Sequence, residues 1–235
     1  MPERFEHFRN QIADLPISVV RVAAIDALEI SSVEIDYWQQ RSKIWAPLSD
    51  GEIACFLSHR KAWKTIVSSG EPWAFVAEDD IHVSDDFQMF FGDSCWFPAG
   101  TDLIKAETSR ARIVMSLENS GQAHGHGVRR LVSDHTGSGG YFISRNGADK
   151  LLRLSETICE PADRFLFSPD LPGSSQLNVY QIDPALCIQD VYLTDQYGGV
   201  GLGGHIPCGG FDPAMPKPKR KGIAKFRHEV MRPIN

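Results

Sequence analysis

Apolar side chains recur along this chain at the spacing of helices in some stretches and at the spacing of strands in others. Residues 3–14 carry apolar side chains three or four positions apart, as one face of an amphipathic helix requires. A proline ends this predicted helix, and the apolar run at residues 17–24 predicts a strand. A second helix, of about 20 residues, is predicted to begin at a Ser49 or Asp50 cap and to end at Gly70.

Strand and helix patterns alternate through the rest of the chain. The apolar run Trp73–Ala77 follows the long helix directly and has the length of a strand. Later runs predict strands at 102–105, 112–117, 128–132, 141–144, 179–182 and 185–189, and helices at 146–154 and 161–166. Residues 28–47 predict a loop or short helices. This alternation predicts an α/β fold with a mixed, mostly parallel sheet flanked by helices.

The composition is that of a soluble globular protein, with 42% apolar residues in a chain of 235. No stretch approaches the roughly 18 uninterrupted apolar residues of a transmembrane helix, and the first residues lack the apolar core of a signal peptide. Five scattered cysteines form no Cys-x-x-Cys pair, which favours reduced thiols. We therefore expect a cytoplasmic protein with one domain over residues 1–212.

The net charge of −6 hides a basic C-terminus. Residues 217–235 hold seven Lys or Arg and one acid, so the rest of the chain has 17 basic and 29 acidic residues. An acidic body argues against nucleic acid as a partner. We predict that residues 213–235 form a basic tail whose Lys219, Arg220 and Lys221 contact an anionic membrane surface. A solvated, frayed terminus is the alternative.

Three consecutive carboxylates, Glu78, Asp79 and Asp80, follow the apolar run Trp73–Ala77. Like charges at the end of one strand repel each other. A divalent cation would offset this repulsion, because hard cations take oxygen ligands. Ligands of open α/β sheets gather at the carboxyl ends of strands. The segment therefore predicts a metal and phosphate site, with a solvated acidic turn as the alternative.

Five segments occur in an order that bears on function. They are the Glu-x-x-Cys-x-x-Ser-His helix within Gly51–His59, the acidic triplet Glu78–Asp80, the segment Asp102–Glu107 with Lys105 inside it, the run Gly139–Ser144, and Pro161–Asp163. Their order is similar to glycosyltransferase family 25, which includes bacterial lipopolysaccharide and lipooligosaccharide galactosyltransferases. The resemblance covers residues 3–190, and the helix motif together with the acidic triplet makes it specific.

The resemblance implies a GT-A type, Rossmann-like fold and an inverting transfer of a hexose, usually galactose, from a UDP-sugar. It implies that Asp80 ligates Mn²⁺ (or Mg²⁺) and that Asp79 contacts the metal or the donor. Glu78 lies at the donor site, or faces back toward the long helix in a structural role. The acceptor would be a lipid-linked saccharide, so the enzyme would work as a peripheral protein at the inner face of the cytoplasmic membrane.

The start of the chain departs from the family pattern. Members usually begin with an apolar strand and an Asn-Leu-(Asp/Pro)-Arg-like segment, and Met1 falls just after that point. A catalytically silent relative that binds a sugar or a partner protein is therefore a second hypothesis. A metal-dependent hydrolase using Asp79, Asp80 and a histidine is a third. The lack of a paired His-x-His or His-x-Asp strand motif near the triplet counts against it.

An inverting transfer also needs a general base for the acceptor hydroxyl. Asp163 is the expected base, because the start of a helix keeps a carboxylate ionised. Simple helix capping explains a Pro-x-Asp segment equally well. Gly139 and Gly140 allow a donor to approach the backbone closely, and a tight turn into a strand is an equal alternative.

Several polar residues are expected around this site. Ser58 and His59 are expected to hydrogen-bond to the carboxylate strand, with Glu52 near the same helical face, and so to orient the metal site. A satisfied core histidine without a functional role is the alternative for His59. His124 and the nearby His126 are predicted in a flexible surface loop rather than in a metal pair.

Overall fold

The computed structural model describes residues 2–44, 46–171, 174–193 and 198–202 of the chain. Its α-helices are α1 (Pro2–Gln11), α2 (Ser32–Gln39), α3 (Asp50–Ser69), α4 (Arg145–Leu154) and α5 (Ala162–Phe167). Its strands are β1 (Trp73–Ala77), β2 (Ile81–Val83), β3 (Leu103–Lys105), β4 (Gly121–Ala123), β5 (His126–Arg130), β6 (Gly140–Ser144), β7 (Val179–Asp183) and β8 (Cys187–Gln189). Short 3-10 helices occur at η1 (Ala27–Glu29), η2 (Phe87–Phe90), η3 (Ser174–Gln176) and η4 (Asp190–Tyr192).

The larger sheet has six strands in the order β1-β6-β3-β7-β5-β4, and β2 pairs with β8 in a separate sheet. In the larger sheet β3 and β7 are parallel, and the other four neighbouring pairs are antiparallel. The expectation of an α/β fold with a mixed sheet is confirmed, but the expectation of a mostly parallel sheet is wrong. The reason is that β6 inserts between β1 and β3 in the opposite direction, while β4 and β5 form a hairpin.

The hairpin between β4 and β5 closes through a two-residue turn. His124 and Gly125 have φ angles of 51° and 85°, and a type I′ turn needs positive φ at both central residues. His126 lies in β5, where its ring nitrogens pair with the Asp86 carboxylate and the Pro184 carbonyl oxygen. The prediction of a flexible surface loop is therefore wrong for His126, whereas His124 lies at the exposed turn of the hairpin.

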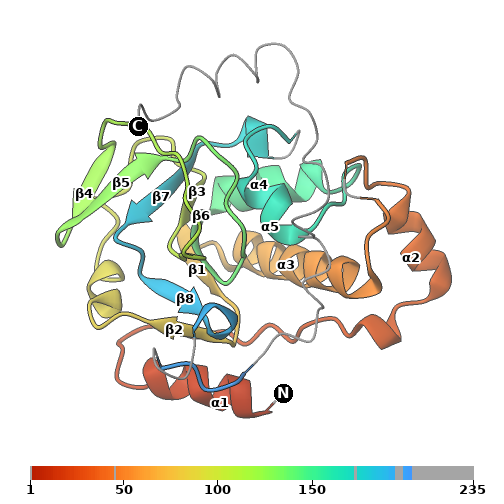
Figure 1. Cartoon of the computed structure of the whole chain (residues 1–235), viewed down its shortest axis with the longest axis horizontal. Coiled ribbons are helices and arrows are strands. Elements are labelled where there is room, and N and C mark those ends of the chain that lie inside the picture. The colour runs from red at the N-terminus through yellow and green to blue at the C-terminus, as the bar shows by residue number, and fades with distance from the viewer. Residues whose placement is uncertain (1, 45, 172–173, 194–197, 203–235) are drawn as a thin grey trace.

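The central strands β3 and β6 are buried on both faces of the six-stranded sheet, with successive side chains of each strand pointing to opposite sides. Leu103 and Ile143 pack on one side, in a cluster with buried residues of α3, α4 and α5. Ile104 and Phe142 pack in a second cluster, with Ile12 just after α1 and with residues around β2. Figure 1 shows α3, α4 and α5 grouped beside one another and α1 next to β2.

The long helix α3 has the predicted bounds. Ser49 and Glu52 form a capping box, and Gly70 takes the left-handed conformation that ends the helix. Phe56 and Trp63 lie on its fully buried face. Because β1 begins only a few residues after Gly70, the packing of α3 also sets where the acidic end of β1 lies.

Two predicted strands do not form ladders in the described part of the chain. Residues 17–24 are extended but unpaired, and Val19 and Val20 are exposed. Residues 112–117 make a single bridge, between Met115 and Leu131. An apolar run becomes a strand only where a neighbouring strand offers backbone hydrogen-bond partners. The spacing of apolar residues along the sequence does not show whether such a neighbour exists.

The predictions for the basic tail fall on residues 213–235, which lie outside the described residues, as do Lys219, Arg220 and Lys221. None of the described helices combines the length and the apolar character needed to cross a bilayer. The described cysteines carry free thiols, in line with the expectation of reduced cysteines: Cys55, Cys95, Cys159 and Cys187.

Candidate active site

The candidate site lies where β1 ends in the acidic triplet of Glu78, Asp79 and Asp80. β1 pairs with β6 along its length, and the ladder continues beyond it, where the Glu78 N–H donates to the Gly139 carbonyl oxygen at 2.8 Å. The Asp190 N–H donates to the carbonyl oxygen of Asp80, also at 2.8 Å. Main-chain bonds thus hold both ends of the triplet and fix the positions of its carboxylates.

Glu78 points back toward α3, as its predicted structural role requires. Its Oε1 accepts from Ser138 Oγ at 2.6 Å and pairs with His59 Nε2 at 3.3 Å, and its Oε2 accepts from Gln189 Nε2 at 3.1 Å. Burial alone would raise the pKa of Glu78, but His59, Ser138 and nearby positive charge bring that pKa below its usual range. The Glu78 carboxylate is therefore ionised and engaged by side chains of the protein.

A chain of hydrogen bonds orients the His59 ring. Trp63 Nε1 donates to Tyr141 Oη at 2.9 Å, and Tyr141 Oη lies 2.9 Å from His59 Nδ1. With the indole proton accepted by its oxygen, the Tyr141 hydroxyl has its own proton to give to Nδ1, and in that tautomer of His59 the Nε2 proton points at Glu78. The predicted hydrogen bond from His59 to the carboxylate strand is confirmed.

Asp79 and Asp80 share one cationic partner, Arg4 of α1, which the sequence patterns did not identify. Arg4 Nη2 lies 2.8 Å from Asp80 Oδ2 and 3.0 Å from Asp79 Oδ1. Asp80 is 2% exposed, and burial followed by the charge of Glu78 raises its pKa to about 6 in spite of Arg4. The carboxylates of Asp79 and Asp80 therefore converge on one nitrogen of the Arg4 guanidinium. The single positive charge of Arg4 does not balance the three carboxylates of the triplet.

The position of Arg4 follows from how α1 docks. Gln11 Nε2 donates to the Ile81 carbonyl oxygen, and Gln11 Oε1 accepts the Val83 N–H, both at 2.9 Å. Ile12 is buried in the core just after the helix. Gln11 follows Arg4 by two helical turns and so lies on the same face. The sequence signal for this position was an arginine seven residues before Gln11, on the face of α1 that packs against β2.

Gln189 is a second residue that sequence reasoning missed. It ends β8, and the pairing of β8 with β2 carries it to the triplet. Its Nε2 lies 3.1 Å from Glu78 Oε2 and 3.3 Å from Asp80 Oδ1, so one amide bridges two carboxylates. A glutamine at the end of a short apolar run has no distinguishing pattern in the sequence.

A buried ion pair supports the turn beside the triplet. Lys105 Nζ lies 2.8 Å from Glu107 Oε2, and both side chains are 0% exposed. Lys105 also donates to the Gly137 carbonyl oxygen, and the Gly139 N–H donates to Glu107 Oε2 at 3.0 Å. Burial raises the pKa of Glu107 to about 7 against the pull of Lys105. Charged residues inside the apolar pattern of β3 and just after it were the sequence signal for this pair.

The same turn reaches Asp163, the predicted base. The Gly137 N–H donates to Asp163 Oδ2 at 3.0 Å, and the Arg164 N–H donates to Asp163 Oδ1 at 2.7 Å. Asp163 is half-buried in the first turn of α5. Burial, then the charges of Glu78 and Asp163, hold the pKa of the Cys55 thiol well above its usual range. The fold thus brings Asp163 into the electrostatic neighbourhood of the triplet.

The structure corrects the expectation for Glu52 and Ser58. The Glu52 carboxylate caps α3 by accepting from the backbone N–H and the hydroxyl of Ser49. Ser58 Oγ donates to the Ala54 carbonyl oxygen at 2.7 Å and accepts the Ile25 N–H at 2.8 Å. Neither side chain is bonded to the triplet. Consecutive helix positions lie about 100° apart, so Ser58 and His59 do not face the same strand.

Gly139 and Gly140 lie in the interior of the fold. A Cβ on Gly139 would come within 2.6 Å of Gln189 Cγ, and a Cβ on Gly140 would collide with the Cys187 sulfur and crowd Phe75. Close packing among these side chains therefore accounts for both glycines. The expected donor contact is not needed to explain them.

Two groups of side chains have the chemistry to hold a metal ion. The oxygens of Asp79 and Asp80 converge on one atom of a guanidinium, and an oxygen donor set of this kind suits Mn²⁺ or Mg²⁺. The ligand atoms of Cys55, His59 and Glu78 lie within 4.8 Å of one another and would suit a softer cation. Both ring nitrogens of His59 are already hydrogen-bonded, so the aspartates are the better candidates.

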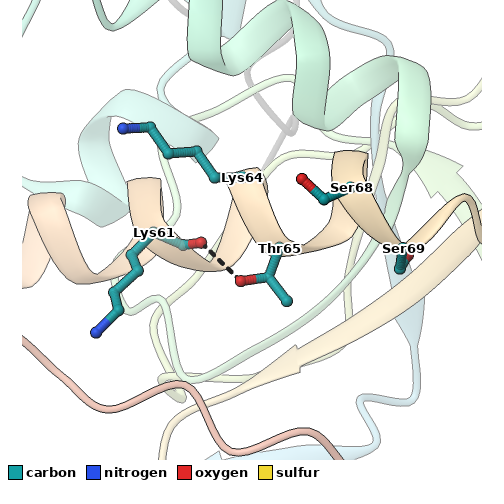
Figure 2. A pocket seen from close by; sticks show the side chains of 5 residues that line it. All are labelled: Lys61, Lys64, Thr65, Ser68 and Ser69. Atoms are coloured by element: carbon teal, nitrogen blue, oxygen red, sulfur yellow. Dashed lines mark hydrogen bonds between the residues drawn. The ribbon is translucent and has the colours of Figure 1, made fainter.

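A hollow on the outer surface of α3 shares no residue with the acidic site. Figure 2 shows the side chains that line it, all from one helix: Lys61, Lys64, Thr65, Ser68 and Ser69. The Thr65 hydroxyl donates to the Lys61 carbonyl oxygen, so it is used within the helix. The hollow contains no carboxylate, and we place the candidate site at the acidic triplet.

Comparison with known proteins adds a family to this geometry. Residues 1–166, which include Arg4, the triplet and Asp163, match glycosyltransferase family 25 (LPS biosynthesis protein). Over 166 residues, 66% of the chain, the sequence is 30% identical to LgtB, a lacto-N-neotetraose biosynthesis glycosyltransferase of Neisseria meningitidis serogroup B, and the match covers 60% of that protein.

Two further relatives give similar matches. LgtE, a lacto-N-neotetraose biosynthesis glycosyltransferase of the same organism, is 28% identical over 154 residues, which cover 62% of the chain and 55% of the relative. The lipooligosaccharide biosynthesis protein lic2B of Haemophilus influenzae is 29% identical over 155 residues, which cover 63% and 57%. The chain spans about three fifths of the length of the curated relatives it matches.

Proposed function

Because the chain belongs to glycosyltransferase family 25, we propose that it transfers a hexose, galactose in the first instance, from a UDP-sugar to a saccharide acceptor. The relatives are named for the biosynthesis of lacto-N-neotetraose and lipooligosaccharide, so the proposed acceptor is a lipid-linked lipooligosaccharide or lipopolysaccharide saccharide. The observation that carries the proposal is the convergence of Asp79 and Asp80 at the end of β1. A nucleoside diphosphate with its divalent cation is a ligand whose charge suits this arrangement.

Asp79 and Asp80 are the proposed ligands of Mn²⁺ or Mg²⁺. When bound, this cation supplies a Lewis acid that offsets the charge of the leaving diphosphate. Glu78 contributes differently, because its carboxylate is already engaged by His59, Ser138 and a glutamine. We assign Glu78 the task of holding the end of β1 so that the two aspartates keep their positions.

The proposed transfer inverts the anomeric centre, with Asp163 as general base. The acceptor oxygen attacks the anomeric carbon while the bond to the diphosphate breaks, and the hydroxyl proton passes to Asp163. Each Asp163 oxygen accepts one backbone N–H, from Gly137 and Arg164, and these two bonds fix the orientation of the carboxylate. Asp163 is only half-buried, so the residue is not sealed from an acceptor.

Donor binding tests this function directly. The chain is expected to bind UDP in the presence of Mn²⁺ and to lose that binding when EDTA removes the metal, as isothermal titration calorimetry would measure. UMP serves as a control, because it lacks the second phosphate and should show little dependence on the metal. Equal affinity for UDP with and without Mn²⁺ would contradict a metal-dependent transferase and favour a catalytically silent sugar- or protein-binding relative.

The Asp163→Asn variant tests the general base. Asparagine keeps the shape of the side chain, so UDP binding should persist while the rate of hexose transfer falls by about 10²- to 10⁴-fold, the range for loss of a positioned base. Release of UDP from UDP-galactose in the presence of acceptor measures the rate. Asp36→Asn, at an exposed position of α2, is the matched control. If Asp163→Asn retains most of the wild-type rate, Asp163 only orders the turn and the helix.

The place of action follows from the acceptor. A lipid-linked saccharide requires the enzyme to reach a membrane surface, and we propose the inner face of the cytoplasmic membrane. Contact of Lys219, Arg220 and Lys221 with anionic lipid stays a prediction, because the basic tail lies outside the described residues.

A further inference from the structure

Arg4 has properties that the transfer as proposed does not use. Its Nη2 pairs with both Asp79 and Asp80, the carboxylates assigned to the metal. The side chain is 15% exposed, and its buried Nε has no hydrogen-bond partner among the described residues. A largely buried cation with an unused donor therefore occupies the point on which the two metal-binding oxygens converge.

The backbone that carries Arg4 is fixed, whereas its side chain is long and rotatable. Gln11 binds two backbone atoms of β2, and Ile12 anchors the end of α1 in the core. The Cα of Arg4 consequently cannot leave the site without undocking the helix. A guanidinium that releases Asp79 and Asp80 stays beside them, within reach of any anion that binds there.

We propose that Arg4 is the resident counter-ion of the acidic site, which yields Asp79 and Asp80 to the divalent cation and then binds the donor diphosphate. The identity of the donor rests on the proposed function. A cation held by Asp79 Oδ1 and Asp80 Oδ2 would take the position of Arg4 Nη2, so metal and guanidinium exclude each other at that point. A diphosphate offers the displaced guanidinium a pair of oxygens that matches its planar fork, and it accepts from Nε, which has no hydrogen-bond partner among the described residues.

This exchange couples metal binding to donor binding. When no UDP-sugar is bound, metal entry leaves the mostly buried guanidinium of Arg4 without a hydrogen-bond acceptor. This loss opposes metal binding. When the UDP-sugar is bound, its diphosphate accepts hydrogen bonds from Arg4, and this cost to metal binding disappears. Because a coupling free energy is reciprocal, Mn²⁺ strengthens the binding of UDP by the same factor as UDP strengthens the binding of Mn²⁺.

Electron paramagnetic resonance of free Mn²⁺ tests the exchange on the full chain. Arg4→Gln and Arg4→Met both remove the competing charge, so each is expected to bind Mn²⁺ on the order of tenfold more tightly than wild type without UDP, a change of ~1.4 kcal/mol. The factor by which UDP strengthens Mn²⁺ binding should be smaller in both variants. Arg9→Gln removes the same charge from an exposed position of α1 and should leave both quantities at their wild-type values.

Two results would overturn the proposal. One is Mn²⁺ affinity in both Arg4 variants that is no higher than in wild type, including the case in which no protein binds Mn²⁺. The other is an equal gain in Arg9→Gln, which would reflect general charge rather than exchange at the site. Thermal unfolding identifies an Arg4 variant that fails to fold. The Mn²⁺ affinity of the other Arg4 variant then decides the test. If the wild-type chain transfers no hexose but the Arg4 variants still bind Mn²⁺ more tightly than wild type, only the proposed function is contradicted.

Discussion

The Asp80→Asn variant is expected to lose hexose transfer by on the order of 10²-fold or more, the scale for removal of one preorganised electrostatic group. Asp80 is the more deeply buried of the two aspartates that meet Arg4, and its oxygen lies closer to the shared nitrogen. Asparagine preserves the shape and removes the charge. Steady-state release of UDP from UDP-galactose, with acceptor and Mn²⁺, measures the effect.

The stability of the same variant separates loss of function from unfolding. Burial and Glu78 raise the pKa of Asp80 from 3.8 to about 6, so the folded protein binds more protons than the unfolded chain between these two values. The free energy of unfolding therefore falls as the pH rises from 3.8 to about 6, and it stays lowered above that pH, where Asp80 is ionised in the folded protein as well. We expect the Tm of Asp80→Asn at pH 7.5 to equal or exceed that of wild type.

A matched control completes this test. Asp85→Asn makes the same change at an exposed position just after β2 and should leave the transfer rate unchanged. Near-normal transfer in Asp80→Asn would move the metal site away from the end of β1. A fall of equal size in both variants would point to a general effect of charge on the assay.

The Lys105→Met variant is expected to lower the free energy of unfolding by about 3–5 kcal/mol, because it leaves a buried carboxylate without its cation. Lys105 and Glu107 are fully buried, so water cannot replace the missing partner. For a protein of this size the loss corresponds to a fall in Tm on the order of 10 °C. Denaturant unfolding followed by circular dichroism measures the change.

The pH dependence and a second substitution identify the cause. Glu107 already has a pKa raised to about 7 by burial, and loss of Lys105 removes an influence that lowers it. The variant should therefore differ less from wild type at pH 5.5, where Glu107 is protonated, than at pH 8. Lys105→Met combined with Glu107→Gln should recover part of the stability. Lys64→Met, at an exposed position of α3, is the control. A loss that is equal at both pH values would indicate a packing defect instead.

Features that depend on neighbours in sequence were predictable. The bounds of α3 follow from the Ser49 cap and from Gly70, and both signals act within one helical turn of the end they mark. The acidic triplet and its link to His59 also follow from local patterns, because a strand that succeeds a docked helix returns along it. The position of the candidate site was accessible for this reason.

Features that depend on strand partners were not predictable in the same way. The direction of β6 relative to β1 and β3 is decided by which strands become neighbours, and apolar periodicity carries no information about that choice. Arg4 and Gln189 reach the triplet from remote positions through α1 and β8. The predicted role of Glu52 failed because a local interaction was available. Its carboxylate caps its own helix and needs no tertiary contact.

The acidic site takes its side chains from both ends of the described chain, and this has a consequence for synthesis. Asp80 is translated well before Gln189, whose amide bridges it to Glu78. At about 5–20 residues per second, the interval between the two lasts roughly 5–20 s. During that time β2, on which α1 docks, also lacks its partner β8. Among the described residues, the triplet is therefore a part of the fold that acquires some of its neighbours late as the chain leaves the ribosome.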